Sequence, residues 1–95
     1  MKKIEITNVG DLVSLAGYED GFEIYKKQIK PYDPAEDLLI VFPANIVYVT
    51  SSFFQGLFAE IVGKCKKPLG EHIMIEALSN SPYILMRFNE FISVD

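Results

Sequence analysis

The sequence predicts a single α/β domain spanning residues 1–95, with a mixed or mostly parallel sheet of about four or five strands and helices packed on it. Apolar segments of strand length alternate along the chain with segments of helical periodicity, and this order implies crossover connections between parallel strands. A chain of 95 residues has room for one core. Its hydrophobic fraction of 49% and charged fraction of 23% are typical of a folded globule.

The first strand and the first helix are expected near the beginning of the chain. A strand is predicted for residues 3–9, because Ile4 and Ile6 fall on one face of an alternating pattern. A helix is predicted from about Tyr18 to Lys30, and Ser14 is an alternative start. Apolar side chains recur there at helical spacing, namely Tyr18, Phe22, Tyr25 and Ile29. Two glycines, at positions 17 and 21, lower the helix propensity and leave the start open.

A fully buried strand is predicted for Leu38–Phe42. This apolar run has no alternation, which is typical of a strand covered on both faces. Pro31 and Pro34 precede it in a surface loop, and Pro43 ends it. A short extended segment, residues 46–49, then leads to a polar turn.

The most regular helical pattern begins after that turn. Apolar side chains recur on one helix face at Phe54, Leu57, Phe58, Ile61, Val62 and Cys65. Ser52 and Gln55 have the spacing of a capping box, and Ser51 is an alternative N-cap. Lysines at positions 64, 66 and 67, followed by Pro68, end the helix.

The last strand and the last helix follow. Residues 72–78 are predicted as a strand, and residues 79–82 as a helix start with Pro82 in the first turn. The apolar side of this helix comes from Ile84, Leu85, Phe88, Phe91 and Ile92.

Charge and composition disfavour several classes of function. A net charge of −4 and a pI near 4.9 do not suit a protein that neutralises nucleic-acid phosphates. No apolar run reaches the length of a membrane span, and the first residues do not resemble a secretion signal. Cys65 is the one cysteine and cannot form an internal disulfide. These features predict a cytoplasmic protein without nucleic-acid or membrane partners.

The residues that could carry chemistry are few. His72 is the single histidine and is expected at the surface, at the start of a strand. Cys65 lies on an apolar helix stripe, which favours a buried and inert thiol. The sequence has neither the ligand spacing of a zinc site nor a glycine-rich phosphate loop. We therefore expect no catalytic residues, metal or cofactor.

Two serines are the main functional candidates. Ser51 and Ser52 lie where an extended segment turns into the most regular helix, and a phosphoryl group is well tolerated at such a position. Both are phosphorylation candidates on this ground. The alternative is that they only cap the helix.

The stretch Leu38–Val62 resembles the central strand, turn and helix of STAS domains. It is most similar to STAS-like domains of unknown function, in which Ser-Ser-Phe precedes a Leu-Phe helix. The resemblance implies the anti-sigma factor antagonist fold, a kinase-like ATPase as partner, and a phosphorylated serine that matches Ser51. Thr50 and Phe53 depart from the aspartate and glycine of the family turn.

The resulting expectation is a regulatory protein-interaction module and not an enzyme. Its partner is a kinase-like ATPase or another signalling protein. Its partner-binding residues are Thr50, Ser51, Ser52, Phe53 and Gln55. Phe53 falls off the apolar stripe, so it is either an exposed interface anchor or packed against the preceding loop.

Two further expectations accompany this one. The high content of apolar and aromatic residues favours self-association into a homo-oligomer. The alternative function is a domain that senses a small molecule or nucleotide, with the ligand at the carboxyl ends of the strands.

Overall fold

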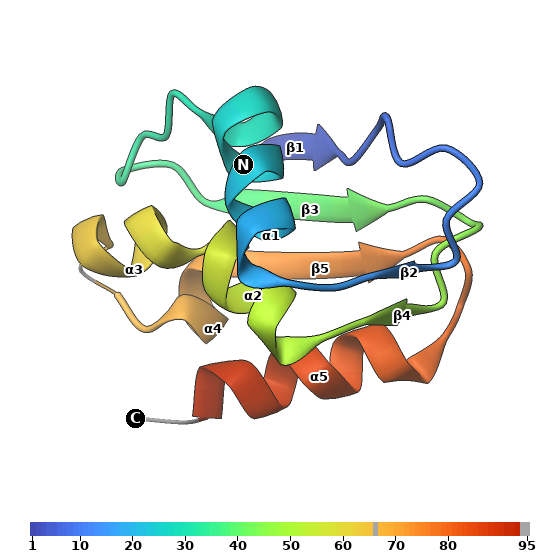
Figure 1. Ribbon diagram of the computed structural model, residues 1–95. Helices are drawn as coiled ribbons and strands as arrows, with labels where there is room; N and C mark the ends of the chain where they lie inside the picture. Colours follow the sequence, from blue (N-terminus) through green and yellow to red (C-terminus); the bar gives the residue numbers. More distant parts are fainter. Residues whose placement is uncertain (66, 94–95) are drawn as a thin grey trace.

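The main sheet has three parallel strands in the order β1-β3-β5 (Figure 1). A computed structural model describes residues 1–65 and 67–93 and defines β1 (Lys2–Glu5), β3 (Leu38–Phe42) and β5 (Ile73–Ala77). The register sets Ile4 beside Ile40 and Ile40 beside Ile75. β3 is the central strand, and all of its residues except the half-buried Leu39 are buried. The predicted α/β fold with a parallel sheet and packed helices is confirmed.

A second, smaller sheet contains two parallel strands, β2 (Ser14–Leu15) and β4 (Tyr48–Val49). The predicted four or five strands are thus divided between two sheets, and the main sheet is narrower than expected. The first strand also ends before residue 9, because Asn8 and Gly10 both have φ of 60° and turn the chain away. The chain then forms β2 at Ser14 and Leu15. The alternative start of the first helix at Ser14 is therefore wrong.

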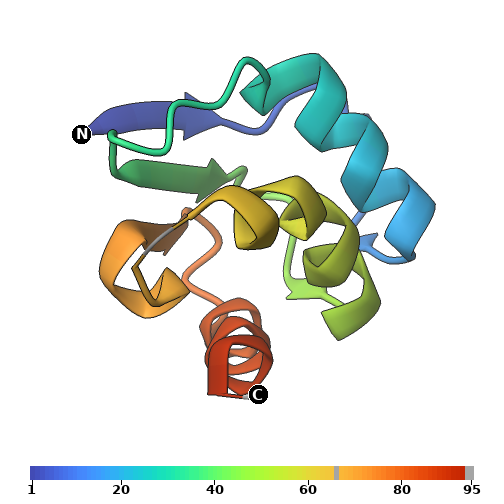
Figure 2. The ribbon, with the colours of Figure 1, turned by 90° about the vertical axis from the view of Figure 1, so that its left-hand side faces the viewer.

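The helices lie on one face and at one side of the main sheet. α1 (Tyr18–Ile24) continues into the π-helix η1 (Tyr25–Ile29), which matches the helix predicted from Tyr18. α2 (Ser51–Leu57) and α3 (Ala59–Lys64) follow β4. α4 (Leu69–His72) and α5 (Pro82–Ser93) flank β5. Figures 1 and 2 show α1 and α2 on the same face of the sheet, while α5 runs beside β5.

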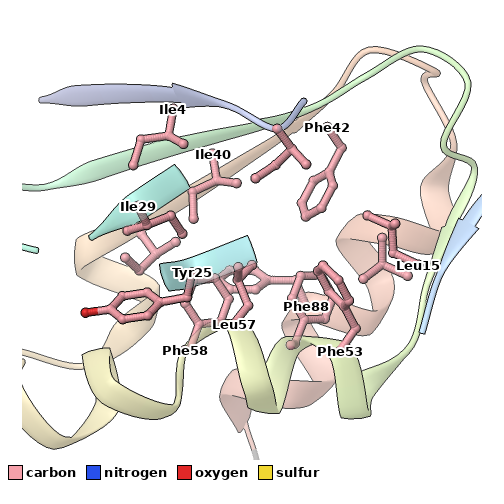
Figure 3. Packing of buried hydrophobic residues seen from close by; sticks show 14 of the residues in the cluster. Ile4, Leu15, Tyr25, Ile29, Ile40, Phe42, Phe53, Leu57, Phe58 and Phe88 are labelled. Atoms are coloured by element: carbon pink, nitrogen blue, oxygen red, sulfur yellow. The ribbon is translucent and has the colours of Figure 1, made fainter. Parts of the chain in front are cut away.

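The core fills the space between the sheet and these helices (Figure 3). Ile4 and Ile40 point from the strands toward Tyr25, Leu57 and other side chains of the helical layer. Between α2 and α5 the core consists mainly of aromatic rings, and Phe54 contacts several of them. Its ring centroid is 6.0 Å from that of Phe58, 5.6 Å from Phe88 and 6.1 Å from Phe42.

The long predicted helix is interrupted at Phe58. The backbone of Phe58 has φ −106° and ψ 9°, so α2 and α3 are separate helices. Ile61 is fully buried, as predicted, but Val62 is 54% exposed and Cys65 is half-buried. The prediction that Val62 lies in the core is wrong, because the break turns the apolar stripe of α3 relative to that of α2.

Helices α1 and α2 cross in close contact through two glycines. A Cβ atom on Gly21 would overlap the carbonyl oxygen of Phe53, and a Cβ atom on Gly56 would overlap that of Tyr18. Only glycine lets the two backbones approach this closely. The low helix propensity of Gly21 is therefore offset by the packing of α1 on α2.

Candidate functional site

The turn from β4 into α2 is fixed by Thr50. Its amide donates to the carbonyl of Leu15 (3.0 Å), and its backbone is extended, with φ −78° and ψ 159°. The Thr50 hydroxyl accepts a hydrogen bond from the amide of Phe53 (3.2 Å), which makes Thr50 the N-cap of α2. The prediction of Ser52 or Ser51 as the cap is wrong, because the helix begins two residues earlier than the Ser52–Gln55 capping-box pattern indicated.

The two serines have different surroundings. Ser52 lies inside the first turn of α2, half-buried, with its hydroxyl 3.0 Å from that of Thr50. Ser51 is exposed. Of the two phosphorylation candidates, Ser51 is therefore the more accessible.

Phe53 lies in the core and not on the surface. Its side chain is fully buried, and its ring packs against Phe42 (6.5 Å between centroids) and Phe54 (6.4 Å). The expectation of an exposed interface anchor at Phe53 is wrong. The cause is the position of α2, which contacts α1 on one side and α5 on another and so buries a wider arc than a single stripe.

Two of the predicted residues meet α5 across a groove of about 330 Å³. Ser51 and Gln55 line it from α2, and Glu90 and Phe91 line it from α5. We call this the α2–α5 groove. Both Ser51 and Gln55 are exposed, so their side chains are accessible to a binding partner.

A charged and aromatic cluster is connected to this groove through Glu90. Arg87 Nη1 lies 2.7 Å from Glu90 Oε2, and Arg87 Nε donates to the Tyr48 hydroxyl (3.0 Å). The hydrogen bonds with Glu90 and then Tyr48 raise the pKa of Arg87. The ring of Tyr83, which is 55% exposed, lies 6.5 Å from that of Tyr48. Sequence reasoning missed this cluster, because no spacing in the sequence links Tyr48 to α5.

A second polar cluster surrounds His72. The expectation of a surface histidine is wrong, because His72 is 1% exposed at the end of α4. Its Nδ1 lies 2.9 Å from Asp37 Oδ1 and its Nε2 lies 2.6 Å from the Tyr32 hydroxyl. Lys67 Nζ lies 3.4 Å from the same Asp37 oxygen. These bonds hold the loop before β3 against α4.

The charge states of this cluster favour a structural role. The hydrogen bond from His72 lowers the pKa of Asp37, and Lys67 adds to this effect. Burial raises the pKa of Tyr32, so its phenol is stabilised in the neutral form. The His72 side chain is fully buried, and a substrate could not reach its ring without rearrangement of the loop.

A second hollow, of about 480 Å³, lies between the loop after β1 and the helix α1. Apolar side chains of Val9, Leu12 and Leu15 line one part of it, and Asp20 and Gln28 are among its polar residues. Glu23 and Lys27 also line this hollow. A hydrogen bond with Lys26 lowers the pKa of Glu23, whose carboxylate is 2.9 Å from Lys26 Nζ.

Within residues 1–65 and 67–93, no group of three or more His, Cys, Asp or Glu side chains is placed to hold a metal ion. No helix in the same part of the chain is long and apolar enough to cross a membrane. Comparisons with protein-family models, with curated proteins and with solved structures find no match for this chain.

Proposed function

We propose that this domain is a cytoplasmic, non-enzymatic regulatory module that binds another protein through the α2–α5 groove. The observation that carries the proposal is the exposure of Ser51 and Gln55 on a groove whose α5 side includes Glu90, the ion-pair partner of Arg87. Arginine, with tryptophan and tyrosine, is enriched among the residues that dominate binding energy at protein interfaces. Thr50 and Ser52 support this surface by fixing the turn, and Phe53 supports it from the core.

The partner we propose is a kinase-like ATPase or a similar signalling protein. The resemblance of Leu38–Val62 to STAS-like domains supports this class of partner, and the accessible Ser51 supports control by phosphorylation. A phosphoryl group would add close to two negative charges at Ser51, in a groove that already contains the Glu90 carboxylate. Repulsion between these charges would change the binding surface. The fold would persist, because Ser51 is neither the helix cap nor part of the core.

The proposal is tested by titrating the purified domain with the kinase-like ATPase encoded nearest to its gene. We expect Ser51→Asp to weaken binding at least about tenfold and to leave thermal stability nearly unchanged. Lys64→Gln is the control, because it lowers the net charge by the same amount at an exposed side chain of α3. Equal binding by parent and Ser51→Asp, together with no phosphorylation of Ser51 by the ATPase, would contradict control of binding by phosphorylation of Ser51. Full binding after replacement of both Gln55 and Glu90 by Ala would contradict the groove as the binding surface.

A second candidate function rests on the hollow beside α1. It lies near the carboxyl end of β1, and open α/β sheets commonly bind ligands at that end of their strands. A domain that senses a small molecule or nucleotide would use this hollow. Titration with nucleotides, followed by NMR of the amides of residues 8–12 and 20–28, would separate the two functions, because a groove-binding protein partner would shift α2 and α5 amides instead.

A further inference from the structure

The outer edge of β1 has an uneven pattern of hydrogen bonding. β1 is the first strand in the order β1-β3-β5, so only one of its edges is paired with β3. The amide of Lys2 donates to Asp37 (2.8 Å) and that of Ile6 to Val41 (2.9 Å). Backbone groups alternate along a parallel ladder, so those of Lys3, Glu5 and Thr7 point away from β3.

At Thr7 this outer edge is closed by a side chain. The Thr7 amide donates to Gln28 Oε1 (2.8 Å), and the Thr7 carbonyl accepts from Gln28 Nε2 (2.8 Å). The primary amide of Gln28 thus takes the place of a backbone amide on a neighbouring strand. In the described part of the chain, no comparable partner contacts the outward backbone groups of Lys3 and Glu5. Both side chains are more than half exposed, at 57% and 64%.

We propose that a second copy of this chain pairs with β1 in antiparallel orientation, about a two-fold axis at Ile4. In this register Lys3 lies opposite Glu5 of the partner subunit, and Glu5 lies opposite Lys3 of the partner subunit. Opposite charges directly across an antiparallel pair are stabilising. Each such pair also exchanges both of its backbone hydrogen bonds, because the outward groups belong to the same residues.

The neighbouring registers are unfavourable. An axis at Lys3 would set two lysines opposite each other, and like charges in that position are destabilising. An axis at Glu5 would set two glutamates opposite each other. It would also require the outward groups of Thr7, which Gln28 already occupies. Charge therefore selects the axis at Ile4, and the Gln28 contact excludes the axis at Glu5 on a second ground.

The dimer is expected to be weak and dependent on concentration. β1 is four residues long, and a ladder of this length buries less than the roughly 800 Å² per partner of a standard stable interface. Its surface is separate from the α2–α5 groove, so a dimeric domain could still bind a protein partner. Association through β1 and binding at the groove are independent, and each can fail without the other.

Sedimentation velocity over a wide concentration range tests the proposal by charge reversal. Lys3→Glu alone and Glu5→Lys alone should each weaken the dimer at least about tenfold, because each sets like charges opposite each other. An equimolar mixture of the two variants should restore association as a heterodimer, and the double variant should restore the homodimer. Lys64→Glu, an equal charge change at an exposed side chain of α3, should have no effect.

Hydrogen exchange measured by NMR identifies the surface involved. The amides of Lys3 and Glu5 should become protected as the protein concentration rises, while the inward amide of Ile6 is protected throughout. A monomer at every concentration would overturn the proposal. A dimer whose Lys3 and Glu5 amides stay unprotected, or whose charge-reversed mixture does not associate, would overturn it too, because another surface would then be used.

Discussion

Thr50 stabilises the candidate binding turn through one hydroxyl oxygen. Because this oxygen accepts from the Phe53 amide at the start of α2, Thr50→Ala should lower the free energy of unfolding by about 0.5–2 kcal/mol. Thr50→Ser keeps an N-cap hydroxyl and should cost much less. Ser52→Ala loses only the contact with the Thr50 hydroxyl and should also cost less than Thr50→Ala. Urea denaturation of the three variants measures the order, and a larger loss for Ser52→Ala would contradict the assignment of the cap.

The same turn marks a limit of sequence reasoning at the scale of single residues. Thr50, Ser51 and Ser52 are consecutive hydroxyl residues, and each is an acceptable N-cap. The spacing of Ser52 to Gln55 selected the wrong one, since the start of α2 depends on the Thr50 amide bonding to Leu15. That contact joins residues distant in the sequence, and no local pattern reveals it.

The close crossing of α1 and α2 predicts how an added methyl group at a helix contact changes the stability of the domain. Gly56→Ala should destabilise the domain by about 1–3 kcal/mol or more, because the new methyl group would force α2 away from the backbone of Tyr18. Gly63→Ala is the matched control in the neighbouring helix α3. An added Cβ there meets no atom within 4 Å, so the change should be neutral or stabilising by up to about 1 kcal/mol.

Thermal melting of the two glycine variants, monitored by circular dichroism, compares these effects directly. Similar melting temperatures for Gly56→Ala and Gly63→Ala would mean that the α1–α2 contact is not tight. Gly21→Ala should behave like Gly56→Ala, since its Cβ would meet the backbone of Phe53 from the opposite helix.

Elements with strong patterns were predicted well, and short ones were not. The unbroken apolar run of β3 and the proline at the start of α5 both indicated their elements correctly. β2 has two residues and α4 has four, too few for any periodicity to appear. The break at Phe58 was missed for another reason, since the apolar spacing continues through it in the sequence.

For the whole molecule, the contact between Asp37 and His72 predicts a dependence of stability on pH. The hydrogen bond from His72 lowers the pKa of Asp37 below its ordinary value of 3.8. A carboxyl group with a lowered pKa contributes stability above that ordinary value, and this contribution is lost as the pH falls through the folded-state pKa. Stability should therefore decline on acidification below about pH 4.

Asp37→Asn should lower stability at neutral pH and make this acid decline shallower. Urea denaturation between neutral and strongly acidic pH gives the slope for each protein. Asp11→Asn is the control, because it removes an exposed carboxylate from a turn. An unchanged slope in Asp37→Asn would show that the bond to His72 does not contribute to the acid sensitivity.

The overall architecture followed from the order of elements along the chain, because alternating strands and helices have few ways to fold. The candidate site did not follow in the same way. Ser51 and Gln55 were predicted from local pattern, but their neighbours Glu90 and Phe91 come from α5. The burial of His72 also depends on Tyr32 and Asp37, which precede β3. Contacts between distant segments determine what is exposed.

The parallel sheet also bears on how the chain reaches its native state. Ile4, Ile40 and Ile75 lie across from one another, although about 35 residues separate each from the next along the chain. Each strand pairing in the main sheet therefore closes a long loop, which costs chain entropy before any ladder bond forms. The helices need only local contacts to begin. We expect them to gain structure first and the three strands to assemble late, on the slow millisecond-to-second scale of topologies dominated by distant contacts.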